Sequence, residues 1–111
     1  MKNIKPIFKL WFVDEHNNYV FGEGSAKLLK TISETNDLTK AIEILNISYK
    51  KAWNLIKKIN KSMNIPVVQS FRGGYGGGGG MILTDEGKSL LNLYDSLYKN
   101  IDELISKIKD N

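Results

Sequence analysis

The strongest constraint on the fold is the stretch 46–61, which reads N-I-S-Y-K-K-A-W-N-L-I-K-K-I-N-K. Ser48 is a favoured N-cap residue and stands directly before a run with helical periodicity. Asn46 tolerates the left-handed conformation in which a preceding helix ends. The stretch therefore predicts the end of one helix, a tight turn and the start of another.

The second of these helices has two unlike faces when its residues are plotted at about 100° per residue. The apolar face consists of Ala52, Ile56 and Ile59. The opposite face is polar and cationic, and consists of Lys50, Asn54, Lys57 and Lys61, bordered by Lys51 and Lys58. Lysines suit phosphates and an asparagine suits a base edge, as a recognition helix for a DNA groove requires. The alternative is an ordinary amphipathic helix with a solvated lysine face.

Two shorter helices are predicted before the turn, over residues 25–34 and 38–45. Each has apolar residues at helical spacing. Asn36 is suited to end the first, and Asp37 is an N-cap candidate for the second. Two short helices joined by about three residues, the second of them cationic, predict a helix-turn-helix over residues 37–61.

A β-hairpin is predicted over residues 8–21. Apolar and other residues alternate from Phe8 to Val13, a polar cluster occupies 14–18, and an apolar run resumes at Tyr19. His16 lies in the predicted loop. Because the sequence offers no second histidine and no nearby carboxylate pair, we interpret it as an exposed turn residue rather than a metal ligand or catalytic group.

A second hairpin, a wing, is predicted over residues 67–83, with strands at 67–71 and 81–83 around a glycine loop at 73–80. Pro66 prevents the cationic helix from continuing into it. A phosphate-binding loop of the nucleotide type needs Gly-Lys-Ser/Thr at the start of a helix, and Met81 follows here instead. Backbone amides at a glycine-rich hairpin tip can instead approach a DNA phosphate.

The last predicted helix covers residues 84–109, and Thr84 is its N-cap candidate. Its apolar residues form a heptad seam with spacings of about three and four. The seam consists of Leu90, Tyr94, Leu97, Ile101, Leu104 and Ile108. The seam is too long for one small domain to cover. We expect part of it to pack on the first helix and the hairpin, and part to pair with the same helix of a second chain.

Length and composition exclude several classes of function. The 111 residues predict one compact domain, and 16 Lys and Arg against 12 Asp and Glu give a net charge of +4. The segment from Ser48 to Arg72 has six cations and no acid, which suits a polyanionic partner. No cysteine is present, no long apolar run suggests a membrane segment, and no targeting peptide is visible. We therefore expect a cytoplasmic protein, not an enzyme, without cofactor or metal.

Several motifs resemble a known family. They are Leu28-Leu29 with Ile32, Ile47-Ser48-Tyr49-Lys50 with Ala52-Trp53, Asn60, the glycines 73–74 and 76–79, and Leu83-Thr84 with Gly87. Over residues 24–98 the chain resembles the DNA-binding domain of ModE-type, molybdate-responsive transcriptional regulators, which share a winged helix-turn-helix with LysR-type regulators. Asn36 and Asn46 stand where that family usually has glycine, and Tyr75 stands where its wing usually has lysine.

The resemblance implies an α+β, mostly α fold: a winged helix-turn-helix with an N-terminal β-hairpin and a long C-terminal dimerisation helix. It implies a homodimeric regulator of double-stranded DNA. Full-length members of the family continue into molybdate-binding domains, and we expect no such domain in these 111 residues. The expected DNA contacts are Ser48, Tyr49, Lys50, Lys51, Asn54, Lys57, Lys58, Lys61, Arg72, Gly74, Tyr75 and Gly76. The alternative is a protein-interaction module that pairs with a separate effector-sensing protein.

Overall fold

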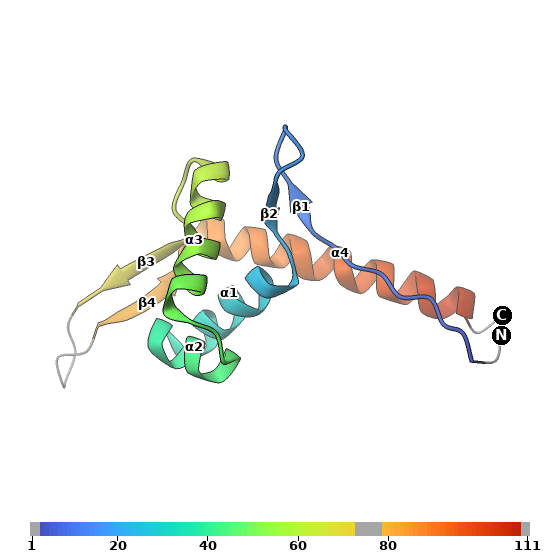
Figure 1. Ribbon diagram of the computed structural model, residues 1–111, viewed down its shortest axis with the longest axis horizontal. Coiled ribbons are helices and arrows are strands. Elements are labelled where there is room, and N and C mark those ends of the chain that lie inside the picture. The colour runs from blue at the N-terminus through green and yellow to red at the C-terminus, as the bar shows by residue number, and fades with distance from the viewer. Residues whose placement is uncertain (1–2, 73–78, 110–111) are drawn as a thin grey trace.

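The computed structural model describes residues 3–72 and 79–109. Within these ranges the chain forms four helices and two two-stranded antiparallel sheets (Figure 1). The elements are β1 (Phe12–Val13), β2 (Tyr19–Phe21), α1 (Glu23–Thr35), α2 (Leu38–Leu45), α3 (Tyr49–Met63), β3 (Val68–Phe71), β4 (Gly80–Leu83) and α4 (Asp85–Lys109). The mixed but mainly helical content agrees with the predicted fold class.

The boundaries between α1, α2 and α3 are those predicted from the capping residues. Asn36 ends α1 and Asn46 ends α2, with left-handed φ angles of 54° and 53°. The Asp37 carboxylate accepts a hydrogen bond of 3.1 Å from a backbone N–H in the first turn of α2. The Ser48 hydroxyl accepts one of 3.0 Å from the first turn of α3. These short-range bonds satisfy backbone donors that a helix start leaves unpaired.

Two helices are longer than the sequence predicted. Helix α1 begins at Glu23 rather than Ser25, because one glycine in the first turn costs a helix only about 1 kcal/mol and does not stop it. Helix α3 continues past Lys61 to Met63 and ends at Asn64, whose φ is 55°. Asparagine in the left-handed conformation thus ends α3 as well as α1 and α2.

The paired part of the first hairpin is shorter than predicted. Strand β1 is limited to Phe12 and Val13, which lie opposite Phe21 and Tyr19, and the five-residue loop 14–18 is as predicted. Burial still alternates along the predicted strand. Phe8, Leu10 and Phe12 are partly buried, and Lys9, Trp11 and Val13 are exposed. Residues 3–11, here called the arm, instead run alongside α4 (Figure 1).

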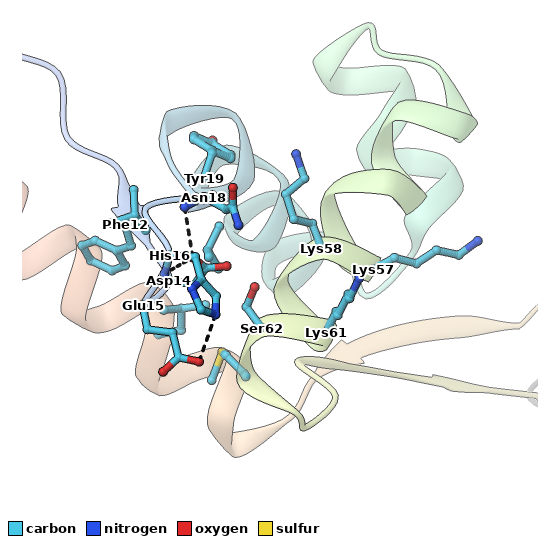
Figure 2. Close-up of a pocket in the computed structure, with 14 residues that line it drawn as sticks. Phe12, Asp14, Glu15, His16, Asn18, Tyr19, Lys57, Lys58, Lys61 and Ser62 are labelled. Carbon is cyan, nitrogen blue, oxygen red and sulfur yellow. Dashed lines mark hydrogen bonds and ion pairs between the residues drawn. The ribbon is translucent and has the colours of Figure 1, made fainter.

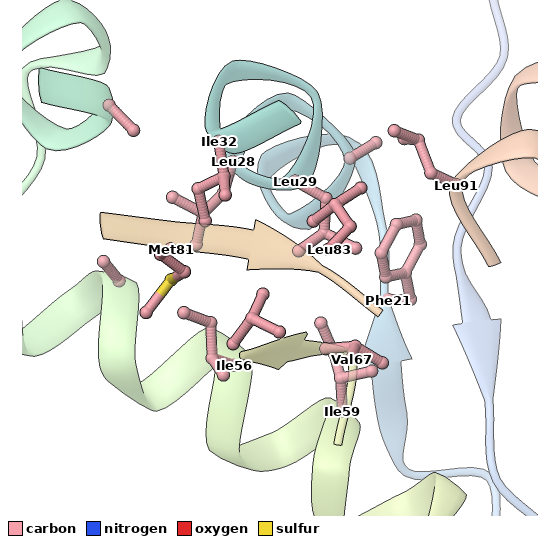
Figure 3. Packing of buried hydrophobic residues seen from close by; sticks show 14 of the residues in the cluster. Phe21, Leu28, Leu29, Ile32, Ile56, Ile59, Val67, Met81, Leu83 and Leu91 are labelled. Atoms are coloured by element: carbon pink, nitrogen blue, oxygen red, sulfur yellow. The ribbon is translucent and has the colours of Figure 1, made fainter. Parts of the chain in front are cut away.

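The hydrophobic core surrounds α1, which packs against α2, α4, β2 and β4. Figure 3 shows side chains from the helices and from both hairpins meeting between α1 and α3. The largest fully buried apolar side chains are Phe21, Leu28, Leu29, Ile32, Ile56, Ile59 and Val67. The core therefore fixes α3 by one face only.

Helix α4 belongs to this core only in its first half. Leu91 and Tyr94 are buried, whereas the second half extends away from the other helices with the arm beside it (Figure 1). The Phe8 ring lies 4.7 Å from the ring of Tyr98, centroid to centroid. The long helix gives the molecule principal extents of 56 × 32 × 24 Å. None of the helices in the described ranges is both long and apolar enough to cross a membrane.

The start of α4 is locked to the segment that joins α3 to β3. The Thr84 hydroxyl donates to the Pro66 carbonyl at 2.7 Å and accepts from the Gly87 N–H at 3.1 Å. A Cβ added at Gly87 would collide with the carbonyl oxygen of Val67. The Asn60 side-chain oxygen accepts a bond of 2.9 Å from the Val67 N–H. These contacts give Asn60, Thr84 and Gly87 structural roles.

The hairpin β3–β4 is attached to the end of α1 through its second strand. The two strands pair in register as far as Phe71 opposite Gly80. The Met81 N–H donates a hydrogen bond of 3.0 Å to the Asn36 carbonyl at the α1 cap. Figure 1 shows this hairpin on one side of α3 and the β1–β2 hairpin on the other.

Candidate nucleic-acid interface

Helix α3 has one face in the core and one face in solvent. Ala52, Ile56 and Ile59 have no exposed surface. All eight predicted DNA contacts of this segment are exposed, namely Ser48, Tyr49, Lys50, Lys51, Asn54, Lys57, Lys58 and Lys61. The structure thus separates the apolar and cationic residues as the helical periodicity predicted.

The five lysines of α3 have no acidic partner in the described part of the chain. The ion pairs found there join Lys27 to Glu23 at 3.1 Å and His16 to Glu15 at 3.4 Å. The segment from Ser48 to Arg72 contains no carboxylate of its own. Clustered cations that the protein does not neutralise create a positive potential that attracts a polyanion.

The N-terminal turn of α3 carries two aromatic residues. Tyr49 is 56% exposed, and its ring lies edge-on to the ring of Trp53, with centroids 6.2 Å apart. Trp53 is partly buried and packs against the core. Tyr49 therefore remains accessible to a ligand, while Trp53 serves largely in packing.

Of the four predicted wing contacts, the structure describes only Arg72. Arg72 is exposed and directly follows β3. The other three predicted contacts, Gly74, Tyr75 and Gly76, lie outside the described residues.

The predicted dimerisation seam divides into two parts. Tyr94 is only 4% exposed and Leu90 packs against the core, so both lie within the chain's own hydrophobic core. Further along α4, Leu104 and Ile108 are 59% and 62% exposed. Leu97 is exposed to a smaller extent, and Ile101 is half-buried. The seam available to a second chain is therefore narrowed to Leu97, Ile101, Leu104 and Ile108.

A groove of about 1190 Å³ lies between the β1–β2 hairpin and the C-terminal half of α3. Figure 2 shows its two walls: the loop with Asp14, Glu15 and His16 on one side, and α3 on the other. Lys58 and Lys61 line the α3 wall. No sequence signal indicates this groove, because its two walls are far apart in the chain and no local motif connects them.

The loop wall of the groove is held by an aspartate. The Asp14 carboxylate accepts backbone N–H bonds of 2.8 Å from His16 and 3.0 Å from Asn18. The hydrogen bond from Asn18 is the main cause that lowers the pKa of Asp14 below its ordinary value. His16 is exposed, as predicted. Within residues 3–72 and 79–109 no three metal-ligating side chains come together.

Several transcriptional regulators and a molybdenum-pterin-binding protein are similar in sequence to this chain. The transcriptional regulator ModE of Yersinia pestis is 36% identical over 83 residues, which are 75% of this chain and 31% of that protein. The DNA-binding transcriptional dual regulator ModE of Escherichia coli K12 is 39% identical over 70 residues, 63% of this chain and 26% of that protein. The molybdenum-pterin-binding protein MopB of Rhodobacter capsulatus is 31% identical over 88 residues, 79% of this chain and 32% of that protein.

These similarities confirm the resemblance to ModE-type regulators that the motifs indicated. The chain is related to them over 63–79% of its length and spans about a third or less of theirs. No family model matches the chain.

Proposed function

We propose that this chain is a sequence-specific DNA-binding transcriptional regulator that acts as a homodimer on double-stranded DNA. The observation that carries the proposal is the exposed face of α3, where lysines without an acidic partner in the described ranges surround Asn54. Phosphate contacts by lysine provide affinity, and a base contact by asparagine provides specificity. The names of the relatives point to the same class of function.

In the proposed complex α2, the turn and α3 act as a helix-turn-helix, with α3 in the major groove. Lys50, Asn54 and Lys57 face the bases, and Ser48 and Tyr49 lie where the helix enters the groove. The remaining lysines, Lys51, Lys58 and Lys61, contact the backbone phosphates. The apolar face of α3 is fully buried, so the helix is held rigidly enough to present these groups together.

The β3–β4 hairpin acts as the wing in this proposal. The bond from Met81 to the cap of α1 fixes its second strand, and Arg72 is exposed where β3 ends. Arg72 and the glycine loop that follows it contact the flanking backbone. An arginine is suited to this position because its guanidinium can bind a phosphate through two N–H groups.

The homodimer forms through the second half of α4. Exposed Leu104 and Ile108 continue the stripe that begins in the core with Tyr94. A dimer would also place two α3 helices on one duplex, as dimeric helix-turn-helix proteins require.

The same stripe supports the second candidate, a protein-interaction module whose α4 pairs with a different protein. Light scattering separates the two candidates. A homodimer in the absence of any partner supports the DNA-binding regulator, and a monomer supports the interaction module.

Selection of bound duplexes from a random pool tests the DNA proposal. The chain should enrich a common motif, and Asn54→Ala should lose discrimination at one base step of that motif. The expected loss is about 1–3 kcal/mol of discrimination. As a matched control, Asn92→Ala changes the same residue type on the exposed surface of α4 and should select the original motif. Enrichment of no motif by the unaltered chain would contradict sequence-specific binding.

A further inference from the structure

The aromatic ring of Tyr19 in β2 lies beneath the side chain of Lys58 in α3. The Lys58 ammonium nitrogen is 5.4 Å from the ring centroid, which is within the range of a cation–π interaction. Both residues line the groove between the hairpin and α3. In Figure 2, Lys57 points away from the hairpin. Lys58 is thus the lysine of α3 that the first hairpin engages.

The Tyr19 ring is itself held in place. Its backbone pairs with Val13 across the β1–β2 hairpin. Its hydroxyl oxygen lies over Gly22, where an added Cβ would come within 2.5 Å of it. The ring is therefore fixed between the turn into α1 and the lysine above it.

Two carboxylates line the same groove as Lys58 but bind other groups. Asp14, across the groove, accepts two backbone N–H bonds, and Glu15 pairs with His16. In the described ranges neither forms an ion pair with Lys58. A ring face attracts an ammonium group without neutralising its charge, so Lys58 keeps its N–H donors for an external anion.

We propose that Tyr19 is a positioning residue that holds the Lys58 ammonium ready for a backbone phosphate of duplex DNA. The inference rests on the proposed function. A lysine side chain that is ordered before binding loses less conformational entropy when it binds. The hairpin thereby becomes part of the DNA-binding apparatus without touching the DNA, which its acidic loop would repel.

Substitutions at Tyr19 distinguish an effect of the aromatic ring from an effect of side-chain size. Tyr19→Phe keeps the ring and should bind a selected duplex like the unaltered protein. Tyr19→Leu keeps an apolar side chain and should bind about two- to tenfold more weakly, because the Lys58 side chain then has more rotamer freedom to lose on binding. In a Lys58→Ala background Tyr19→Leu should have no further effect, because the two residues act as a unit. Thermal unfolding of each variant controls for loss of fold.

NMR of the free protein tests the contact between Tyr19 and Lys58 independently of DNA binding. In NMR spectra the ring should shift the Lys58 ε-methylene resonances upfield, and Tyr19→Leu should abolish the shift. An absence of the shift in the unaltered protein would overturn the inference. If the unaltered protein binds duplex DNA and folded Tyr19→Leu binds it equally well, the inference fails and the proposed function stands. If the unaltered protein binds no duplex, both fail.

Discussion

The hydroxyl of Tyr94 donates a hydrogen bond of 3.0 Å to the backbone carbonyl of Leu10, which ties the middle of α4 to the arm. The Tyr94 ring also packs against the rings of Phe12 and Phe21, at centroid distances of 5.6 and 5.4 Å. One side chain therefore joins the arm, the first hairpin and α4. Tyr94→Phe keeps the ring packing and removes only the hydrogen bond.

We expect Tyr94→Phe to lower the free energy of unfolding by about 1 kcal/mol, because the Leu10 carbonyl loses its donor. Urea denaturation measures the change. Tyr49→Phe is the matched control, because Tyr49 is exposed and donates no hydrogen bond among the described residues. Equal stability of Tyr94→Phe and the unaltered chain would show that the bond contributes nothing.

The same tyrosine predicts a loss of stability at alkaline pH. Burial raises the pKa of Tyr94 above its ordinary value of 10.0, so the folded state favours the neutral phenol. This contribution is complete below pH 10.0 and is lost as the pH rises through the raised pKa. The unaltered chain should therefore lose more stability than Tyr94→Phe between neutral and strongly alkaline pH. Parallel curves for the two proteins would contradict this assignment.

Gly87 provides a test of the joint between α4 and β3. A methyl group there meets the Val67 carbonyl, so Gly87→Ala should lower the free energy of unfolding by about 1–3 kcal/mol. Gly24→Ala is the control, since no atom lies within 4 Å of an added Cβ at that position in α1. It should raise stability by about 0.5–1 kcal/mol, as alanine does in a helix. An unchanged free energy of unfolding for Gly87→Ala would mean that the backbone at Val67 can move away from the added methyl group at little cost.

The exposed stripe of α4 predicts how the proposed dimer can be broken. Leu104→Glu places a charge at a position that is 59% exposed in the single chain and would be buried in the dimer. The dissociation constant of the dimer should rise at least about 30-fold, or ~2 kcal/mol. Ser106→Glu adds the same charge to α4 away from the stripe and should leave the constant unchanged. Sedimentation equilibrium of the two variants compares them directly; a Leu104→Glu protein that stays dimeric would exclude this interface.

The boundaries between α1, α2 and α3 could be predicted because their causes are local. Asp37 and Ser48 cap backbone groups within the next few residues, and Asn36 and Asn46 each end a helix through their own φ angle. The opposite faces of α3 were also predictable, since they depend only on helical geometry. The lysines and Asn54 of the candidate site were found in this way.

Features that depend on distant partners could not be predicted. The alternation of apolar residues from Phe8 to Val13 indicates that one side of this segment is buried. The same alternation is expected whether a second strand or α4 covers that side. The expectation that part of the heptad seam packs within the chain is confirmed, but the seam itself does not say that Tyr94 is one of the residues that do so. The contact between Tyr19 and Lys58 joins one residue of the hairpin to one residue of α3. The two belong to no common sequence motif, so only the fold reveals the contact.

The salt dependence of duplex binding tests the central claim most directly, because α3 is proposed to act through phosphate contacts. About four cations from each subunit neutralise about eight phosphates in a dimer, so the slope of log K against log salt should be near −7, roughly 0.9 per phosphate. Lys61→Ala should make this slope shallower by about 2 while weakening binding to all sequences alike. A slope near zero would contradict the assignment of α3 as a DNA-binding helix.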